Sequence, residues 1–303
     1  MTDALSAFKK HLISHNYDFR ENEPLKNHTT FKIGGTCSFL VCPHSREQLI
    51  DILRRCNELQ IKRYVIGKGS NILASDEGFD GVIIKLTDSF AKITVENTVI
   101  HCQAGASLAK VCHEAYLHGL SGLEFAWGIP GTIGGALYMN AGAYGGEMKD
   151  VVLSATHITD RFQPETFDAE QLKLSYRRSI YTDLPDYCIT DITLQLIPGS
   201  QSEIKAKMDD LMERRKSKQP LEYPSAGSTF KRPEGNYASA LIDQCGLKGL
   251  TVGGAQVSEK HCGFVINKNN ATCCDVLRLI KQIQEKVFSQ TGYHLDCEIK
   301  MLS

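Results

Sequence analysis

Residues 64–73, which read YVIGKGSNIL, combine a short β-branched run with a turn that holds two glycines. Gly67 and Gly69 tolerate positive φ and let backbone N–H groups come close to an anion. The Ser70 hydroxyl and the Asn71 amide add two further donors in the same turn. The stretch therefore predicts a strand that ends in a phosphate-binding loop.

Two familiar phosphate-binding motifs do not fit this loop. A dinucleotide-binding fingerprint needs a third glycine at position 72, where the chain has Ile72. A P-loop needs Ser or Thr directly after its Gly-Lys pair, whereas Gly69 follows Lys68 in this chain. A P-loop would also need a glycine at position 62, where the chain has Lys62. The sequence therefore predicts a loop of another class, with an ordinary strand-to-helix turn as the alternative.

Length and charge limit the kind of protein this can be. A chain of 303 residues is long enough for two or three domains, because single cores stop growing at roughly 250 to 300 residues. The formal net charge is -1, from 34 basic and 35 acidic residues, which gives no general attraction to nucleic acid or to an anionic membrane. No apolar run approaches about 18 residues, and MTDALSAFKKHL does not resemble a signal peptide, so we expect a cytoplasmic protein.

The 11 cysteines predict buried thiols. They are scattered through a chain that shows no secretion signal, and an odd number cannot all pair within one chain. No CxxC pair is present to hold zinc. We therefore expect neither a disulfide framework nor a structural metal.

A second informative stretch runs from Gly119 to Gly146, where nine of the 25 glycines fall. Such density indicates backbone packed closely against a flat or charged group, with aromatic residues such as Trp127 interleaved and Pro130 holding one turn rigid. A flexible linker is the alternative, but linkers rarely carry the only Trp of a chain.

The apolar periodicity predicts an α+β chain. Ser45 with Gln48 fits a capping box at the start of a helix, and Gly292 closes the last helix. Further helices are expected over 107–118 and 203–217, and strands over 82–86, 92–95, 99–102, 151–158 and 187–197. A polar stretch after Pro198 marks a domain boundary. The end of the chain predicts a strand with one apolar face, formed by Tyr293, Leu295, Cys297, Ile299 and Met301.

Several separated motifs agree in order and spacing with one known family. They are HTTFKIGG (28–35), GKGSNIL (67–73), IPGTIGGALYMNAGAYG (129–145), SYRRS (175–179), PSAGSTFKRP (224–233), the runs ALIDQCGLKG and GGAQVSEKHCGFVIN, and Glu298. Over nearly its whole length the chain resembles the UDP-N-acetylenolpyruvoylglucosamine reductases, flavoenzymes that complete UDP-N-acetylmuramate in bacterial peptidoglycan synthesis. It is similar to their shorter second type, because it lacks the extra substrate-covering tyrosine loop of the first type.

The resemblance implies an α+β fold with a two-part FAD-binding region, similar to those of p-cresol methylhydroxylase and vanillyl-alcohol oxidase, and a C-terminal α/β substrate-binding domain. The expected domains are 1–80, 81–198 and 199–303. The implied cofactors are FAD and NADPH, the implied substrate is UDP-N-acetylglucosamine enolpyruvate, and we expect a monomer. The FAD-binding positions that the resemblance implies are Ile66, Gly67, Lys68, Gly69, Ser70, Asn71, Ile72, Ile129, Pro130, Gly131, Thr132, Gly134, Gly135, Asn140, Ala141 and Gly142.

The resemblance also implies three catalytic residues. Arg177 matches the essential arginine of the family, and a guanidinium is suited to a carboxylate that becomes dianionic in the transition state. Ser228 matches the proton donor, and Glu298 matches the remaining catalytic acid. The implied substrate-binding residues are Tyr176, Lys218, Lys231 and Arg232.

Without the resemblance, each catalytic candidate has an ordinary interpretation. Arg177 would be one of a surface arginine pair, Ser228 a turn serine and Glu298 a surface strand carboxylate. Two other functions therefore stay open, a flavin-dependent oxidase on the same scaffold and a non-catalytic nucleotide-binding protein. Three departures from the family pattern, at Arg232, Ser239 and Lys300, concern diphosphate contacts more than catalysis.

Overall fold

The computed structural model describes residues 3–303, which divide into two compact units. Unit 1 contains residues up to 20, 39–67 and 81–214, and unit 2 contains 21–38, 68–80 and 215–303. The chain therefore passes from one unit to the other five times. The predicted domains 1–80, 81–198 and 199–303 stay a prediction, because compact units and functional domains are different divisions of a chain.

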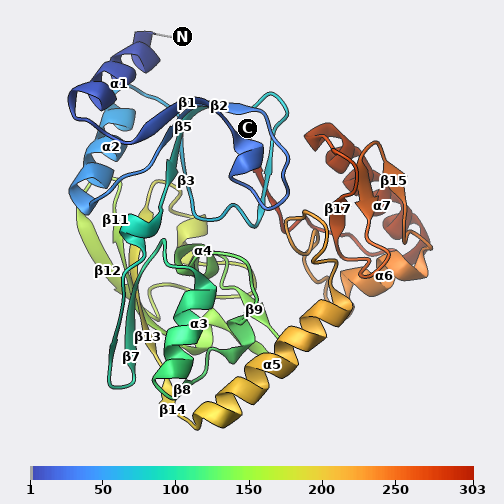
Figure 1. Ribbon diagram of the computed structural model, residues 1–303. Helices are drawn as coiled ribbons and strands as arrows, with labels where there is room; N and C mark the ends of the chain where they lie inside the picture. Colours follow the sequence, from blue (N-terminus) through green and yellow to red (C-terminus); the bar gives the residue numbers. More distant parts are fainter. Residues whose placement is uncertain (1–2) are drawn as a thin grey trace. The chain divides into compact units, whose positions relative to one another are not determined.

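Unit 1 holds most of the secondary structure (Figure 1). Its helices are α1 (Asp3–Ser14), α2 (Arg46–Glu58), α3 (Leu108–Leu117), α4 (Ile133–Tyr138) and most of α5 (Gln201–Lys218). Its strands are β3 (Arg63–Ile66), most of β5 (Phe79–Lys85), β6 (Ile93–Glu96), β7 (Val99–Gln103), β8 (Leu120–Ser121), β9 (Gly142–Ala143), β10 (Gly146–Glu147), β11 (Val152–Ile158), β12 (Pro164–Asp168), β13 (Cys188–Gln195) and β14 (Ile197–Pro198).

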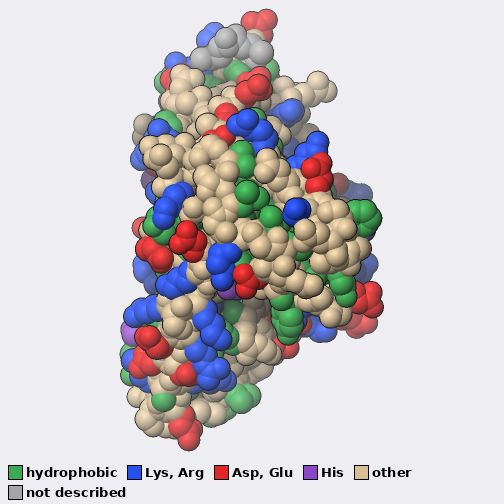
Figure 2. All heavy atoms as spheres, turned by 90° about the vertical axis from the view of Figure 1, so that its right-hand side faces the viewer, with side chains coloured by type: hydrophobic (Ala, Val, Ile, Leu, Met, Phe, Trp, Pro, Cys, Tyr) green, Lys and Arg blue, Asp and Glu red, His purple; other side chains and the backbone are tan. Residues whose placement is uncertain are grey.

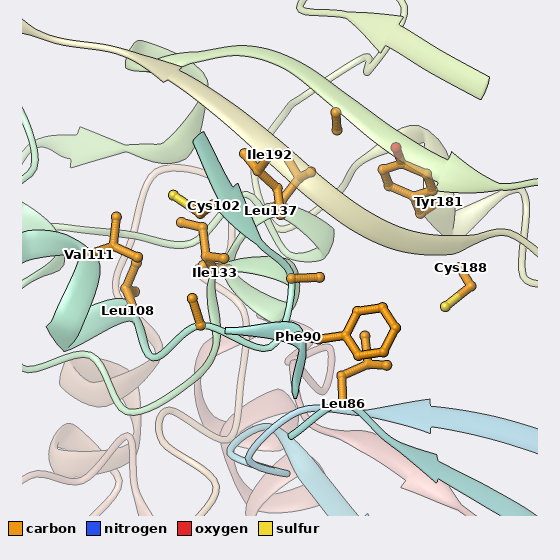
Figure 3. Close-up of a cluster of buried hydrophobic side chains, with 14 of the residues drawn as sticks. Leu86, Phe90, Cys102, Leu108, Val111, Ile133, Leu137, Tyr181, Cys188 and Ile192 are labelled. Atoms are coloured by element: carbon orange, nitrogen blue, oxygen red, sulfur yellow. The ribbon is translucent and has the colours of Figure 1, made fainter. Parts of the chain in front are cut away.

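A five-stranded antiparallel sheet in the order β12-β11-β13-β7-β6 forms the centre of unit 1. Figure 3 shows Ile133 and Leu137 of α4 beside Ile192 of β13, within a buried cluster that also includes Leu108 and Val111 of α3. Burial of these side chains stabilises the position of α4 against the sheet. This packing fixes the glycine-rich stretch in which α4 lies.

Unit 2 contains a three-stranded antiparallel sheet and a short parallel pair. The sheet has the order β15 (Thr251–Val252), β16 (Ala255–Val257) and β17 (Val265–Asn267), and it packs with α6 (Ala238–Gln244) and α7 (Cys273–Thr291). The parallel pair joins β4 (Ile72–Ala74) to β18 (Lys300–Leu302). Strands β1 (Phe19–Pro24), β2 (Thr36–Val41) and β5 each run from one unit into the other along the chain.

The predicted helix ends are largely confirmed. The Ser45 hydroxyl accepts a hydrogen bond from the Gln48 N–H at 3.2 Å, which caps α2. The Gln48 side chain, however, accepts from His44 N–H and not from Ser45, so the expected capping box is only half formed. Gly292 ends α7 with a left-handed φ of 75°.

The predicted face of the C-terminal strand is partly wrong. Leu295 and Ile299 are buried as expected, but Cys297 is exposed and Met301 is 42% exposed. Only residues 300–302 pair with β4, so the two-residue alternation of an extended strand does not run through 293–299. Strand periodicity therefore did not apply to most of this segment.

The surface and the thiols agree with the expectations from composition. Figure 2 shows basic and acidic side chains mixed over the face in view, without a large area of one sign. All the cysteines are free, and most are buried. Within residues 3–303, no helix combines the length and the apolar character that crossing a membrane requires.

His157 of β11 is a buried titratable group that should make stability depend on pH. Its Nδ1 lies 3.0 Å from the Tyr181 hydroxyl, and its ring packs on Phe167 with centroids 4.4 Å apart. Burial lowers the pKa of His157, although the Glu165 carboxylate partly opposes this shift. The folded state therefore favours the neutral ring, whereas the unfolded chain takes up a proton near the ordinary pKa of 6.5.

We accordingly expect the free energy of unfolding to fall as the pH drops through about 6.5 toward the lower folded-state pKa. His157→Phe should flatten that dependence, although it loses the bond to Tyr181. Guanidinium titrations at several pH values would measure the slope, with exposed His113→Gln as the matched control. An unchanged slope in His157→Phe would contradict the assignment.

Candidate active site

The first half of the predicted cofactor loop belongs to unit 1. Strand β3 pairs in parallel with β5 and ends at the buried Ile66, where the loop begins. A Cβ atom on Gly67 would lie 2.3 Å from the Thr132 Oγ1 atom, so only glycine allows this approach. Gly134 is equally restricted, because its Cβ would lie 2.8 Å from that of Ala104. The two glycine-rich segments of unit 1 therefore lie against one another at Gly67 and Thr132.

Backbone donors gather at this point of unit 1. Across the described residues 3–303, the N–H groups of Gly67, Gly131 and Thr132 donate to no backbone carbonyl. The Thr132 hydroxyl caps α4 by accepting from the Gly135 N–H at 3.3 Å. Backbone N–H groups without a protein acceptor are suited to an anion such as a diphosphate.

The second half of the loop belongs to unit 2 and is held by the HTT segment. Gly69 is buried with φ +61°, and a Cβ there would lie 2.2 Å from the His28 carbonyl oxygen. Thr30 N–H donates to the Gly69 carbonyl at 3.3 Å. Throughout the described part of the chain, the N–H groups of Gly69, Ser70 and Asn71 donate to no backbone carbonyl. This half of the loop therefore also presents donors that fit an anionic group.

Each unit by itself presents backbone donors that suit an anionic group. That Ile66 and Gly67 of unit 1 and Lys68–Ile72 of unit 2 hold the diphosphate of FAD stays a prediction. In unit 1, Ile129, Gly131, Ala141 and Gly142 are half-buried and Pro130 and Gly135 are exposed, whereas Thr132 and Gly134 are buried.

The Asn140 side chain is bonded within the protein. Its side chain is fully buried and donates to the Glu147 carboxylate and to the Ser175 carbonyl, both at 3.0 Å. Its Oδ1 accepts from Lys149 N–H at 2.9 Å. The amide therefore ties the glycine-rich stretch to the SYRRS turn. That Asn140 contacts the cofactor stays a prediction.

Arg177 lies in the turn that Asn140 anchors. Its backbone is left-handed at φ +55°, and its Nη2 atom donates to the Gly142 carbonyl at 3.4 Å. The guanidinium also lies 5.1 Å from the centroid of the exposed Tyr176 ring. Arg178 is exposed and pairs with Asp183 at 2.7 Å, as expected for a surface neighbour. Of the two arginines, Arg177 is therefore the one beside the glycine-rich stretch.

Ser228 and Glu298 are brought together in unit 2, although 70 positions separate them in the chain. Glu298 N–H donates to the carbonyl of Thr229, the neighbour of Ser228, at 2.9 Å. Gly227 has φ +78°, and a Cβ there would have nothing within 4 Å. Both Ser228 and Glu298 are half-buried. The two segments that carry this hydroxyl and this carboxyl are therefore bonded to each other, and both residues are partly accessible.

The remaining predicted substrate residues of unit 2 differ in their surroundings. Lys231 N–H donates to the Asp296 carbonyl at 2.8 Å, so Lys231 belongs to the same pair of segments. Arg232 is exposed, with its guanidinium 4.5 Å from the Tyr237 ring centroid. Lys218 is exposed at the end of α5. That Arg177 of unit 1 acts on the same substrate as these residues stays a prediction.

Sequence reasoning missed several residues that support the candidate site. Thr229 is buried, and its hydroxyl accepts from Val265 N–H at 3.0 Å. The Asp76 carboxylate accepts from the N–H groups of Cys273 and Cys274 at 2.7 and 2.9 Å, which holds the segment after β4 to the start of α7. Nothing in local sequence signals either contact, because each partner is distant in the chain.

No metal centre competes with this site in the part of the chain that the structure describes. His11 and His15 stand four residues apart at the end of α1, with ring centroids 4.1 Å apart. Two histidines at this spacing could suggest a metal site, but His11 Nε2 already has a partner, the Asp51 carboxylate at 2.6 Å. Within residues 3–303, no group of three or more His, Cys, Asp or Glu side chains could hold a metal ion.

Comparison with known proteins gives consistent matches over nearly the whole chain. The profile of the FAD binding domain matches residues 37–161, and that of the UDP-N-acetylenolpyruvoylglucosamine reductase C-terminal domain matches residues 219–302. The chain is 48% identical over 281 residues to the UDP-N-acetylenolpyruvoylglucosamine reductase of Caldanaerobacter subterraneus subsp. tengcongensis, covering 93% of this chain and 92% of the relative. It is 46% identical over 285 residues to that of Clostridium perfringens, with coverages of 94% and 93%.

Solved structures agree with these matches. The crystal structure of UDP-N-acetylenolpyruvylglucosamine reductase from Thermus caldophilus superposes with a TM-score of 0.80 at 34% identity, covering 95% of this chain and 99% of that one. p-Cresol methylhydroxylase matches with a TM-score of 0.55 at 11% identity, covering 97% and 88%, which shows the fold alone. The predicted α+β class with a PCMH-like FAD-binding region is therefore confirmed. This chain belongs to the UDP-N-acetylenolpyruvoylglucosamine reductase family.

Proposed function

We propose that this protein is an FAD-dependent reductase that uses NADPH to convert UDP-N-acetylglucosamine enolpyruvate into UDP-N-acetylmuramate for peptidoglycan synthesis. The observation that carries the proposal is the junction of the Ser228 and Glu298 segments, made by the 2.9 Å bond from Glu298 N–H to the Thr229 carbonyl. The two bonded segments carry a hydroxyl and a carboxyl, which are both groups that can transfer protons. Membership of the reductase family supplies the substrate class.

When bound, FAD would supply the hydride for the terminal carbon of the enolpyruvyl ether. Charge then develops on the adjacent carbon and its carboxylate, and the role of the protein is to stabilise and neutralise it. Arg177 is half-buried, so its guanidinium would act at lower dielectric than in water on that carboxylate. Tyr176 would lie beside the same group through its contact with Arg177.

Ser228 would give its hydroxyl proton to the carbon next to the carboxylate. A serine is a weak acid, and the cationic side chains of Lys231 and Arg232, three and four positions on, would favour its loss of a proton. Glu298 would stabilise or protonate the enolate-like product of hydride addition. Lys218 would contact an anionic group of the sugar nucleotide.

The absorbance spectrum of the purified protein tests the proposal most directly. We expect a flavin spectrum that NADPH bleaches and that the enolpyruvyl substrate restores. NADH in place of NADPH would measure the nicotinamide preference. A colourless protein that oxidises no NADPH would instead favour the non-catalytic nucleotide-binding alternative.

An oxidase on the same scaffold is the second enzyme alternative, and it makes different predictions. It would reoxidise its flavin with oxygen at a useful rate in the absence of the enol ether. Oxygen consumption during NADPH turnover separates the two. That the protein is a cytoplasmic monomer stays a prediction. Size-exclusion chromatography would test whether it is a monomer.

A further inference from the structure

The loop predicted to bind FAD is bonded directly to the strand that follows Glu298. Within unit 2, Lys300 N–H donates to the Asn71 carbonyl at 2.9 Å, and Ser75 N–H donates to the Leu302 carbonyl at 2.8 Å. These bonds continue the parallel pairing of β4 with β18. Strand β4 follows the cofactor loop directly in the chain, and its backbone bonds therefore link that loop to β18.

One side chain adds to this pairing at the catalytic position. The Asn71 Nδ2 atom donates to the Glu298 carbonyl oxygen at 3.3 Å. The Glu298 N–H donates to the Thr229 carbonyl at 2.9 Å. The backbone of Glu298 is therefore bonded twice, once by the Ser228 segment and once by the cofactor loop.

The two holding groups differ in how firmly they are fixed. Thr229 is 1% exposed, its N–H donates to the Gly263 carbonyl at 2.8 Å and its hydroxyl accepts from Val265 N–H at 3.0 Å. Asn71 is half-buried and follows Gly69 and Ser70, whose N–H groups donate to no backbone carbonyl of the described chain. Binding of an anion by the loop would therefore restrict Asn71 more than it restricts Thr229.

We propose that Asn71 is a positioning residue for Glu298, so that occupancy of the 67–71 loop by a diphosphate group helps to place the catalytic carboxyl. The inference rests on the proposed function, in which Glu298 acts on the reduced substrate. Asn71 acts through the backbone of Glu298 and need not touch the substrate. Loading of the cofactor would then prepare the acid before the second substrate arrives.

Asn71→Ala in the FAD-loaded protein tests this role. We expect reoxidation of the flavin by the enolpyruvyl substrate to slow about tenfold relative to its reduction by NADPH. A tenfold change in rate is what the loss of one ordinary hydrogen bond would produce. Backbone amides of residues 298–302 should exchange their hydrogens faster than in the parent. Ser75→Ala is the matched control, because Ser75 lies at the other end of β4 and its hydroxyl accepts only from Glu77 N–H at 3.2 Å.

A second measurement needs no variant. In the parent protein, removal of FAD should accelerate exchange at residues 298–302 more than at the buried face of α7, around Ile283 and Val287. Equal acceleration at both places would overturn the proposal, as would Asn71→Ala with parental exchange at 298–302 and equal slowing of both half-reactions. Glu298→Gln distinguishes failure of the proposed function from failure of the positioning inference. If the flavin of Glu298→Gln is reoxidised at the normal rate, the proposed role of Glu298 fails. If reoxidation is slow in Glu298→Gln but normal in Asn71→Ala, only the positioning inference fails.

Discussion

Ser228→Ala should slow reoxidation of the reduced flavin by the enolpyruvyl substrate by about 10² or more, while NADPH still bleaches the flavin. The variant removes only one oxygen atom. The backbone should keep its place, because the neighbouring Thr229 is buried and bonded to Gly263 and to Glu298. Stopped-flow absorbance of each half-reaction measures the effect separately.

The same loop provides a control for Ser228→Ala. Ser225 lies three residues earlier, and its hydroxyl makes only a 3.5 Å contact with the Gly227 N–H. Ser225→Ala should therefore reoxidise at the parental rate. Normal reoxidation by Ser228→Ala would remove Ser228 from the mechanism and leave another group, such as Glu298, as the proton donor.

Gly69→Ala should give a protein that loses FAD on gel filtration and unfolds at a lower temperature. The new Cβ would lie 2.2 Å from the His28 carbonyl oxygen and 3.0 Å from the Thr29 Cα atom. The left-handed backbone at φ +61° adds roughly 1–2 kcal/mol of its own for a residue with a Cβ. Because both neighbours are backbone atoms, the loop itself must move.

Gly235→Ala separates backbone strain from steric overlap. Gly235 has φ +72°, close to that of Gly69, but a Cβ there has nothing within 4 Å. We expect a modest loss of stability with FAD retained. If Gly69→Ala behaved like Gly235→Ala in both thermal unfolding and flavin content, the close packing of the loop against His28 would be refuted.

Local signals in the sequence predicted local structure well. Ser45 began a helix and Gly292 ended one, because caps depend on residues within one turn. The strand before Gly67 and the helix near 107–118 followed from apolar periodicity in the same way. The family motifs also predicted the candidate site residues, including Arg177.

The contacts that build the candidate site were not predictable from local pattern. Thr30 bonds the Ser225 carbonyl across 195 positions, and Asn71 bonds Glu298 across 227. No spacing rule encodes such pairs. The bonds of the buried Asn140 side chain were likewise not predictable from its motif. The family resemblance identified candidate residues, whereas the structure shows how their side chains are bonded.

The pairing of β4 with β18 has a consequence for biosynthesis. Residues 300–302 are synthesised more than 200 positions after residues 72–74, with which they pair. On a ribosome, where chains emerge from the N-terminus at about 5–20 residues per second, β4 must therefore wait for β18 to be made before it gains this neighbour. Loss of residues 300–302 would leave the segment after the cofactor loop with an unpaired edge.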